Sequence, residues 1–231
     1  IYAPVIQTVR GIQQKLTTEG FDQTALIGFA GAPWTIACYM TSGSGKDHDF
    51  PLTVRYAEHD PVFFDRLIDQ ITDVTIRYLI DQIEAGANVI QLFDSWSGTA
   101  RGDLFDRYVI APTQKIVSAL HQAHPTVPVI GFPRLAGTRM IDYHKKTNVT
   151  AIQCDTTVDF KLLFDQDQNI VTQGNLNPDL LIKGGSELDQ GIDHILNVTQ
   201  GRPHIFNLGH GILPQTPIAH VEQLIKRIRG F

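Results

Sequence analysis

The sequence predicts an α/β fold built from repeated β-strand–α-helix units. Six short apolar runs recur along the 231 residues, bounded by Gly, Pro, Asn or Asp and separated by stretches with helical periodicity. The runs are continuously apolar, which indicates strands buried on both faces and hence a parallel sheet with helical crossovers. Six such units fit either a doubly wound sheet or a (β/α)8 barrel lacking two units. No G-x-G-x-x-G follows any run, which disfavours a nucleotide-binding sheet.

The strands are expected where these apolar runs fall. In chain order they are residues 25–31 (ALIGFAG), 88–94 (NVIQLFD), 127–133 (VPVIGFP), 150–155 (TAIQCD), 170–175 (IVTQGN) and 204–210 (HIFNLGH).

Four stretches carry apolar residues at the spacing of an amphipathic helix. Their stripes are Val5, Val9, Ile12 and Leu16; Leu67, Ile71, Val74 and Tyr78; Phe105, Tyr108, Pro112 and Ile116; and Val221, Leu224, Ile225 and Ile228.

Composition narrows the class of protein. The net charge is -5 and no basic block stands out, which disfavours nucleic acid as a partner. No apolar run approaches the ~20 residues that a membrane span requires. The two cysteines, Cys38 and Cys154, lie far apart in sequence, which fits buried thiols in a reducing, cytoplasmic compartment. No linker, repeat or low-complexity segment divides the chain, so residues 1–231 are expected to form a single domain.

Polar and aromatic residues gather where the predicted strands end, which in a βα barrel is the edge that carries the chemistry. After the six strands, in order, come Trp34 and Tyr39; Asp94, Ser95 and Trp96; Arg134; Asp155, Thr156 and Thr157; Asn175; and His210.

Four long motifs, GFAGAPWTIACYM, QLFDSW, QGNLNP and HIFNLGHG, in this order and at these distances, closely resemble uroporphyrinogen decarboxylases. The resemblance implies a (β/α)8 TIM barrel, with about six of the eight βα units in this chain. It also implies a homodimer that works without metal or organic cofactor. The implied reaction removes CO2 from four acetate side chains and converts uroporphyrinogen III to coproporphyrinogen III.

The family has further βα units upstream, so the N-terminal part of the barrel is expected to be missing from residues 1–231. The aspartate and arginines on which the family relies most lie in that upstream part. The catalytic residues therefore stay unassigned in this chain.

The resemblance places substrate binding on Tyr39, Ser95 and His210, and Phe93 is interpreted as an apolar wall for a pyrrole face. Each has a structural alternative. Tyr39 could be a core tyrosine with a satisfied hydroxyl, Ser95 could cap the following helix, and Phe93 could belong to the barrel core. Asp94 is interpreted as a helix cap, like Asp155, and both are left out of the site.

His210 is interpreted as functional because glycines flank it at the end of a predicted strand. Glycines let the backbone turn sharply and let a large flat ligand approach closely. The imidazole can donate a hydrogen bond to a carboxylate and can become charged near neutral pH.

Two alternative functions remain open. A cobamide-dependent methyltransferase of similar fold would need zinc held by a His-x-Cys and a further cysteine, and the sequence has no His-x-Cys. The other alternative is an inactive fragment that only dimerises.

Overall fold

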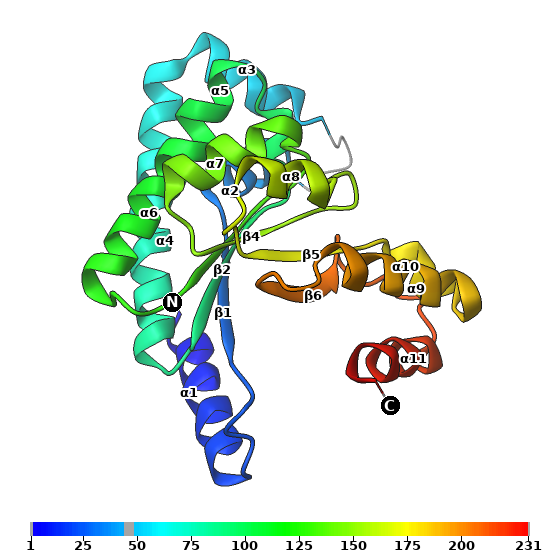
Figure 1. Cartoon of the computed structure of the whole chain (residues 1–231). Coiled ribbons are helices and arrows are strands. Elements are labelled where there is room, and N and C mark those ends of the chain that lie inside the picture. The colour runs from blue at the N-terminus through cyan, green and yellow to red at the C-terminus, as the bar shows by residue number, and fades with distance from the viewer. Residues whose placement is uncertain (1, 44–48, 231) are drawn as a thin grey trace. The chain divides into compact units, whose positions relative to one another are not determined.

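The computed structural model describes residues 2–43 and 49–230, in two compact units, Ile1–Thr150 and Ala151–Phe231. Each unit combines parallel strands with helices (Figure 1). The first contains α1 (Ala3–Thr18), β1 (Ile27–Gly31), α2 (Pro33–Ser42), α3 (Pro51–His59), α4 (Pro61–Glu84), β2 (Val89–Asp94), η1 (Ser97–Thr99), α5 (Asp103–Phe105), η2 (Asp106–Ile110), α6 (Ala111–Ala123), β3 (Val129–Pro133), η3 (Gly137–Arg139) and α7 (Met140–Thr147). The second contains β4 (Ala151–Gln153), α8 (Phe160–Gln166), β5 (Thr172–Leu176), α9 (Pro178–Lys183), α10 (Gly185–Val198), β6 (His204–Leu208) and α11 (Ile218–Arg229).

The predicted α/β class is confirmed. All six predicted strands are present, with ends shifted by one or two residues. In the first unit β1 pairs with β2 and β2 with β3, and in the second β4 pairs with β5 and β5 with β6, all parallel. Pairing in chain order, without the reversal of a doubly wound sheet, is the arrangement of a TIM barrel.

Burial on both faces, which the sequence predicted for every strand, holds for only some of them. Every residue of β3 is buried, whereas β1 alternates and leaves Ile27 and Phe29 45% and 59% exposed. The reason is that α4 covers only the face of β1 that carries Gly28 and Ala30. From α4, the Gln82 side chain also forms hydrogen bonds with the backbone amide and the backbone carbonyl of Phe29. In β6, partly exposed and exposed residues alternate and none is buried.

The long helix α4 begins at Asp60, whose side chain accepts a hydrogen bond from the Phe63 amide, followed by Pro61 at the first helical position. Its core face includes Phe64, Ile68 and Ile71. The face is rotated from the predicted stripe, of which only Ile71 is buried.

Buried threonines explain the rotation of the α4 core face. Thr72 and Thr75 are buried although a pattern search counts them as polar. The Thr72 hydroxyl donates to the Ile68 carbonyl at 2.6 Å, which leaves its methyl group free to pack in the core.

Three buried aromatic rings join α2, α4 and the π-helical turn η2. The Trp34 ring lies 5.8 Å from that of Phe64 and 6.2 Å from that of Tyr108, and Phe64 and Tyr108 are 4.8 Å apart. The stripe predicted over Phe105–Ile116 is buried throughout. This cluster fixes the helix that begins directly after β1.

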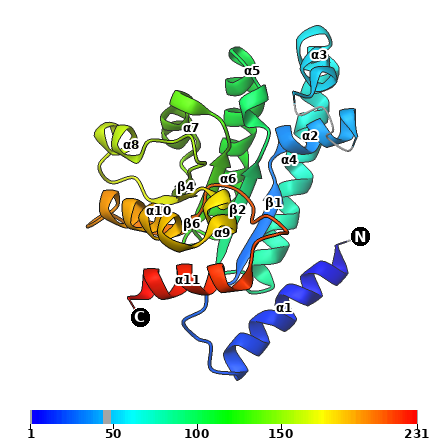
Figure 2. The same cartoon turned by 90° about the vertical axis from the view of Figure 1, so that its right-hand side faces the viewer.

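In the second unit, α11 lies beside α9 and α10 (Figure 2). None of its described residues is buried, and polar contacts hold it. The Arg227 guanidinium donates to both carboxylate oxygens of Asp193 at 2.8 and 2.5 Å, and His220 Nδ1 lies 2.6 Å from the Leu181 carbonyl oxygen.

Among the described helices, none combines the length and the apolar character that crossing a bilayer requires.

We predict that Phe64→Ala lowers the free energy of unfolding by about 3–5 kcal/mol, because it leaves a cavity between Trp34 and Tyr108. Urea denaturation followed by circular dichroism measures the loss. The neighbouring Phe63 is 47% exposed, so Phe63→Ala is the matched control and should cost under about 1 kcal/mol. Equal losses in the two variants would show that the cluster does not hold the unit together.

Candidate functional site

The carboxyl ends of β1 and β2 bring three of the four predicted site residues into the first unit. Phe93 lies in β2, Ser95 follows that strand, and Tyr39 is on α2, which begins directly after β1. Trp96 connects them, because it follows Ser95 in the chain and its ring lies edge-on to the Tyr39 ring at 6.4 Å. His210 belongs to the second unit.

Tyr39 is not a core tyrosine. Its side chain is 47% exposed, and its ring packs edge-on against Phe50 at 6.1 Å. Within residues 2–43 and 49–230, no hydrogen-bond partner of the Tyr39 hydroxyl is found, so this hydroxyl is available to a ligand.

Ser95 is not a helix cap. The next helix, η1, begins at Ser97 with Trp96 at the capping position and no side-chain cap. The hydroxyl of Ser97, the first residue of η1, donates a hydrogen bond to the Arg134 carbonyl at 2.8 Å. The partly exposed Ser95 hydroxyl has no hydrogen bond to the described part of the chain.

Phe93 has features both of an apolar wall facing a ligand and of a core residue. Its ring lies edge-on between Phe29 and Phe132, at 5.9 and 6.1 Å. Phe132 is buried, Phe29 is exposed, and Phe93 itself is partly exposed. It therefore forms the boundary between the core and the open face of β2.

His210 is exposed and follows the end of β6 at Leu208. Neither of its flanking glycines, Gly209 and Gly211, adopts a positive φ, so a left-handed backbone conformation is not what requires them. Gly209 is required for close packing instead, since a Cβ there would lie 2.7 Å from the Thr156 amide nitrogen and 3.0 Å from the Asn175 carbonyl oxygen. The backbone before His210 is thus packed against the loop that follows β4 and against the end of β5.

Asn175, in β5, and Asp155 hold the loop after β4 in shape. The Asn175 side-chain amide donates to the carbonyls of Asp155 and Val158 at 3.1 and 2.8 Å. The buried Asp155 carboxylate accepts from the Thr157 amide and hydroxyl at 2.8 and 2.5 Å, a turn within its own loop. The prediction that Asp155 caps the next helix is wrong, because Asp159 caps α8.

Asp94 is the residue that sequence reasoning underestimated. It is fully buried, and its Oδ1 accepts a hydrogen bond from the Thr35 hydroxyl at 2.6 Å. The same hydroxyl oxygen accepts from the Trp96 amide at 3.1 Å. Asp94 therefore contacts the first turn of α2, which precedes it in the chain, and not the helix that follows it.

The start of α2 explains why a carboxylate is placed there. Ala32 occupies the N-cap position and has no side chain that can cap, so the first amides of the helix need another acceptor. Asp94 fills that role through a hydrogen bond with the Thr35 backbone, and the Thr35 hydroxyl ties the helix of Tyr39 to the loop of Ser95. The Trp34 indole adds a second tie, donating to the Trp96 carbonyl at 3.1 Å and to Thr99 Oγ1 at 3.0 Å.

Burial raises the pKa of Asp94 to about 7, although its hydrogen bonds with Thr35 act in the opposite direction. The second carboxylate oxygen, Oδ2, is buried with no hydrogen-bond partner among the described residues. Burial therefore favours the neutral, protonated form of this carboxyl group more than water does.

The two cysteines are not nucleophiles. Both are buried and free, and burial raises the pKa of Cys38 to about 12 and that of Cys154 still further above its usual range. This confirms the prediction of buried thiols.

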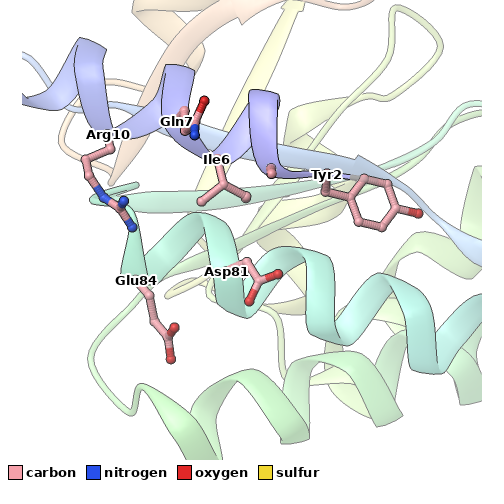
Figure 3. A pocket seen from close by; sticks show the side chains of 7 residues that line it. Tyr2, Ile6, Gln7, Arg10, Asp81 and Glu84 are labelled. Atoms are coloured by element: carbon pink, nitrogen blue, oxygen red, sulfur yellow. The ribbon is translucent and has the colours of Figure 1, made fainter.

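A hollow of about 510 Å³ lies between α1 and the end of α4 (Figure 3), and none of the predicted site residues lines it. Tyr2, Arg10, Asp81 and Glu84 are among the side chains that line it. Glu84 ends α4 shortly before β2 begins, so this hollow lies at the amino ends of the strands, where barrels carry stability rather than chemistry.

The second unit has a larger hollow of about 760 Å³ at the carboxyl ends of β4 and β5. Thr156 lines it from the loop after β4, Asn175 from β5, Asn177 from the position after β5, and His194 from α10.

In residues 2–43 and 49–230, no group of three or more His, Cys, Asp or Glu side chains could hold a metal ion.

Residues 2–231 match the family model described as uroporphyrinogen decarboxylase (URO-D). The chain belongs to this family. It is 47% identical to the uroporphyrinogen decarboxylase of Rhizorhabdus wittichii over 228 residues, which is 98% of this chain and 65% of the relative. The Granulibacter bethesdensis enzyme of the same name is 47% identical over 98% of this chain and 66% of the relative. The chain thus spans about 65% of the length of these curated relatives.

The fold agrees with this assignment. A solved structure described as a methyltransferase from Methanosarcina mazei superimposes with a TM-score of 0.80 over 100% of this chain and 65% of that chain, at 18% sequence identity. At this identity the likeness concerns the fold alone, and the uroporphyrinogen decarboxylase relatives carry the family assignment.

We predict that Asp94→Asn changes how stability depends on pH. The raised pKa means that the folded state binds this proton more tightly than the unfolded chain does. Wild-type stability therefore falls by up to about 1.4 kcal/mol per pH unit as pH rises from about 4 to about 7. Asn keeps the oxygen that accepts from Thr35 but does not titrate. Between pH 5 and pH 8 the stability of the variant relative to wild type should rise by about 1–3 kcal/mol in urea denaturation.

The control for this measurement is Asp81→Asn, which replaces an exposed carboxyl group on α4. It should leave the pH dependence as it is in wild type. An Asp94→Asn curve parallel to wild type between pH 5 and pH 8 would contradict a buried, titrating Asp94.

Proposed function

We propose that the protein containing this chain decarboxylates the four acetate side chains of uroporphyrinogen III to give coproporphyrinogen III. The observation that carries the proposal is the family match over residues 2–231, with 47% identity to curated uroporphyrinogen decarboxylases along 98% of the chain. The exposed polar groups at the carboxyl ends of β1 and β2 support it. The alternative of an inactive fragment concerns residues 1–231 in isolation and not the whole protein.

The chemistry needs little beyond the protein's own side chains. A pyrrole protonated at a ring carbon accepts the electron pair released when CO2 leaves, and so serves as its own electron sink. The enzyme must supply an acid, stabilise the cationic ring and hold the remaining carboxylates in a cleft from which water is largely excluded. We therefore propose that no metal or organic cofactor takes part.

The proposed substrate-binding residues divide these tasks. The hydroxyl groups of Tyr39 and Ser95 donate hydrogen bonds to substrate carboxylates, and Phe93 provides an apolar surface for a pyrrole face. His210 supplies an imidazole that can become cationic opposite a carboxylate. A homodimer in the cytoplasm, with residues 1–231 as part of one barrel domain, completes the proposal.

The direct test is to incubate the full-length protein with uroporphyrinogen III under anaerobic conditions. We expect CO2 release and accumulation of coproporphyrinogen, at a rate that EDTA leaves unchanged. An inactive full-length protein would overturn the proposed function. Loss of activity on chelation would contradict the cofactor-independent reaction and favour a metal-dependent one.

We predict that His210→Asn lowers kcat/KM by roughly one to two powers of ten, because a charge-assisted hydrogen bond contributes about 1.5–3 kcal/mol. Asn keeps a hydrogen-bond donor of similar size but cannot become cationic. His210 is exposed, so the melting temperature should change little. Intact activity together with a melting temperature lowered by many degrees would identify His210 as a structural residue.

A further inference from the structure

Arg134 follows β3 at its carboxyl end, one strand along from Phe93 and Ser95. Its side chain is partly buried. The guanidinium carbon lies 5.9 Å from the centre of the Trp96 ring, and Nη1 lies 3.5 Å from the Ser95 carbonyl oxygen. Arg134 therefore reaches back over the loop that carries the predicted substrate-binding serine.

The backbone of Arg134 is held firmly against that loop. Its amide donates to the Asp94 carbonyl at 3.1 Å, and its carbonyl accepts from the Gly98 amide at 3.1 Å. The next residue packs so closely that a Cβ on Gly98 would lie 2.7 Å from the Leu135 Cβ. The guanidinium thus projects from a fixed point, as expected of a preorganised binding residue.

Arg134 differs in its partners from Arg139, the other partly buried arginine among the described residues of the first unit. Arg107 pairs with Asp65, and Arg139 pairs with Asp106. No carboxylate among the described residues lies in ion-pair range of Arg134, whose polar contact to Ser95 is at the limit of a hydrogen bond. A guanidinium has five donors suited to a carboxylate, and toward the described residues that of Arg134 makes only the long contact to Ser95.

The neighbours of Arg134 indicate which ligand it meets. The Trp96 ring that it covers also contacts Tyr39, whose hydroxyl is exposed. The Ser95 carbonyl oxygen is the second group that the Arg134 guanidinium contacts. The Arg134 guanidinium and the Tyr39 ring therefore contact one aromatic ring, and Ser95 directly precedes that tryptophan in the chain, at the carboxyl ends of three consecutive strands.

We propose that Arg134 is a further substrate-binding residue, which pairs with one carboxylate of the tetrapyrrole alongside Tyr39 and Ser95. This inference rests on the proposed function, because it takes uroporphyrinogen as the anionic ligand. The guanidinium binds through charge and paired hydrogen bonds and takes no part in proton transfer. It should therefore affect substrate binding more than turnover.

The test compares Arg134→Gln, Arg134→Lys and wild type in the full-length enzyme with uroporphyrinogen III. We expect Arg134→Gln to raise KM about tenfold or more with kcat within about threefold of wild type. Arg134→Lys keeps the charge but not the planar pair of donors, so its KM should lie between the two. The wild-type KM should rise with ionic strength, and that rise should be smaller in Arg134→Gln, because salt screens an ion pair.

Arg66→Gln is the matched control, since it removes the same charge from an exposed position on α4 and should leave KM and its salt dependence unchanged. Equal urea denaturation midpoints would show that the variants are folded. An active wild type with an unaltered KM in Arg134→Gln would overturn the role of Arg134 and leave the proposed function intact. A wild type that does not turn over uroporphyrinogen would overturn the function itself.

Discussion

The hydrogen bond between Thr35 and Asp94 is the contact on which the geometry of the first unit's site depends. It joins the first turn of α2 to the last residue of β2, two segments 59 residues apart in sequence. Tyr39 lies one helical turn beyond Thr35, and Ser95 directly follows Asp94, so the contact sets the positions of both. Burying a carboxyl group costs free energy. Asp94 offsets part of this cost because it serves as the hydrogen-bond acceptor that the N-terminus of α2 otherwise lacks.

The surroundings of this contact make it rigid. The Trp34 indole repeats the tie from α2 to the loop after β2, and its ring packs into the core with Phe64 and Tyr108. The loop after β3 then packs on the loop after β2, through the backbone of Arg134 and the close approach of Leu135 to Gly98. Three successive strand ends thus form one firm edge that carries Tyr39, Ser95 and Arg134. Toward the described residues, the only side-chain hydrogen bond of these three is the long one from Arg134 to Ser95.

The second unit uses a different device for the same purpose. There the side-chain amide of Asn175 and the turn made by Asp155 shape the loop after β4, and Gly209 permits the chain before His210 to lie against it. Polar side chains that a motif search marks as candidate ligands are used as internal braces. Tyr39, Ser95 and Arg134 differ from such braces, because their side chains are at least partly exposed and make few hydrogen bonds to the described residues.

The sequence by itself determined the order and type of the strands, the family and the candidates Tyr39, Phe93, Ser95 and His210. Those properties depend on local apolar patterning and on long contiguous motifs, which a single chain displays directly. Only the tertiary structure decided which face of α4 is buried and that Gly209 allows a close backbone contact with Thr156 and Asn175. It also decided that Asp94 caps a helix that precedes it in the chain and that Arg134 has no carboxylate partner among the described residues. Each of these depends on contacts between segments distant in sequence, and spacing along the chain carries no information about such contacts.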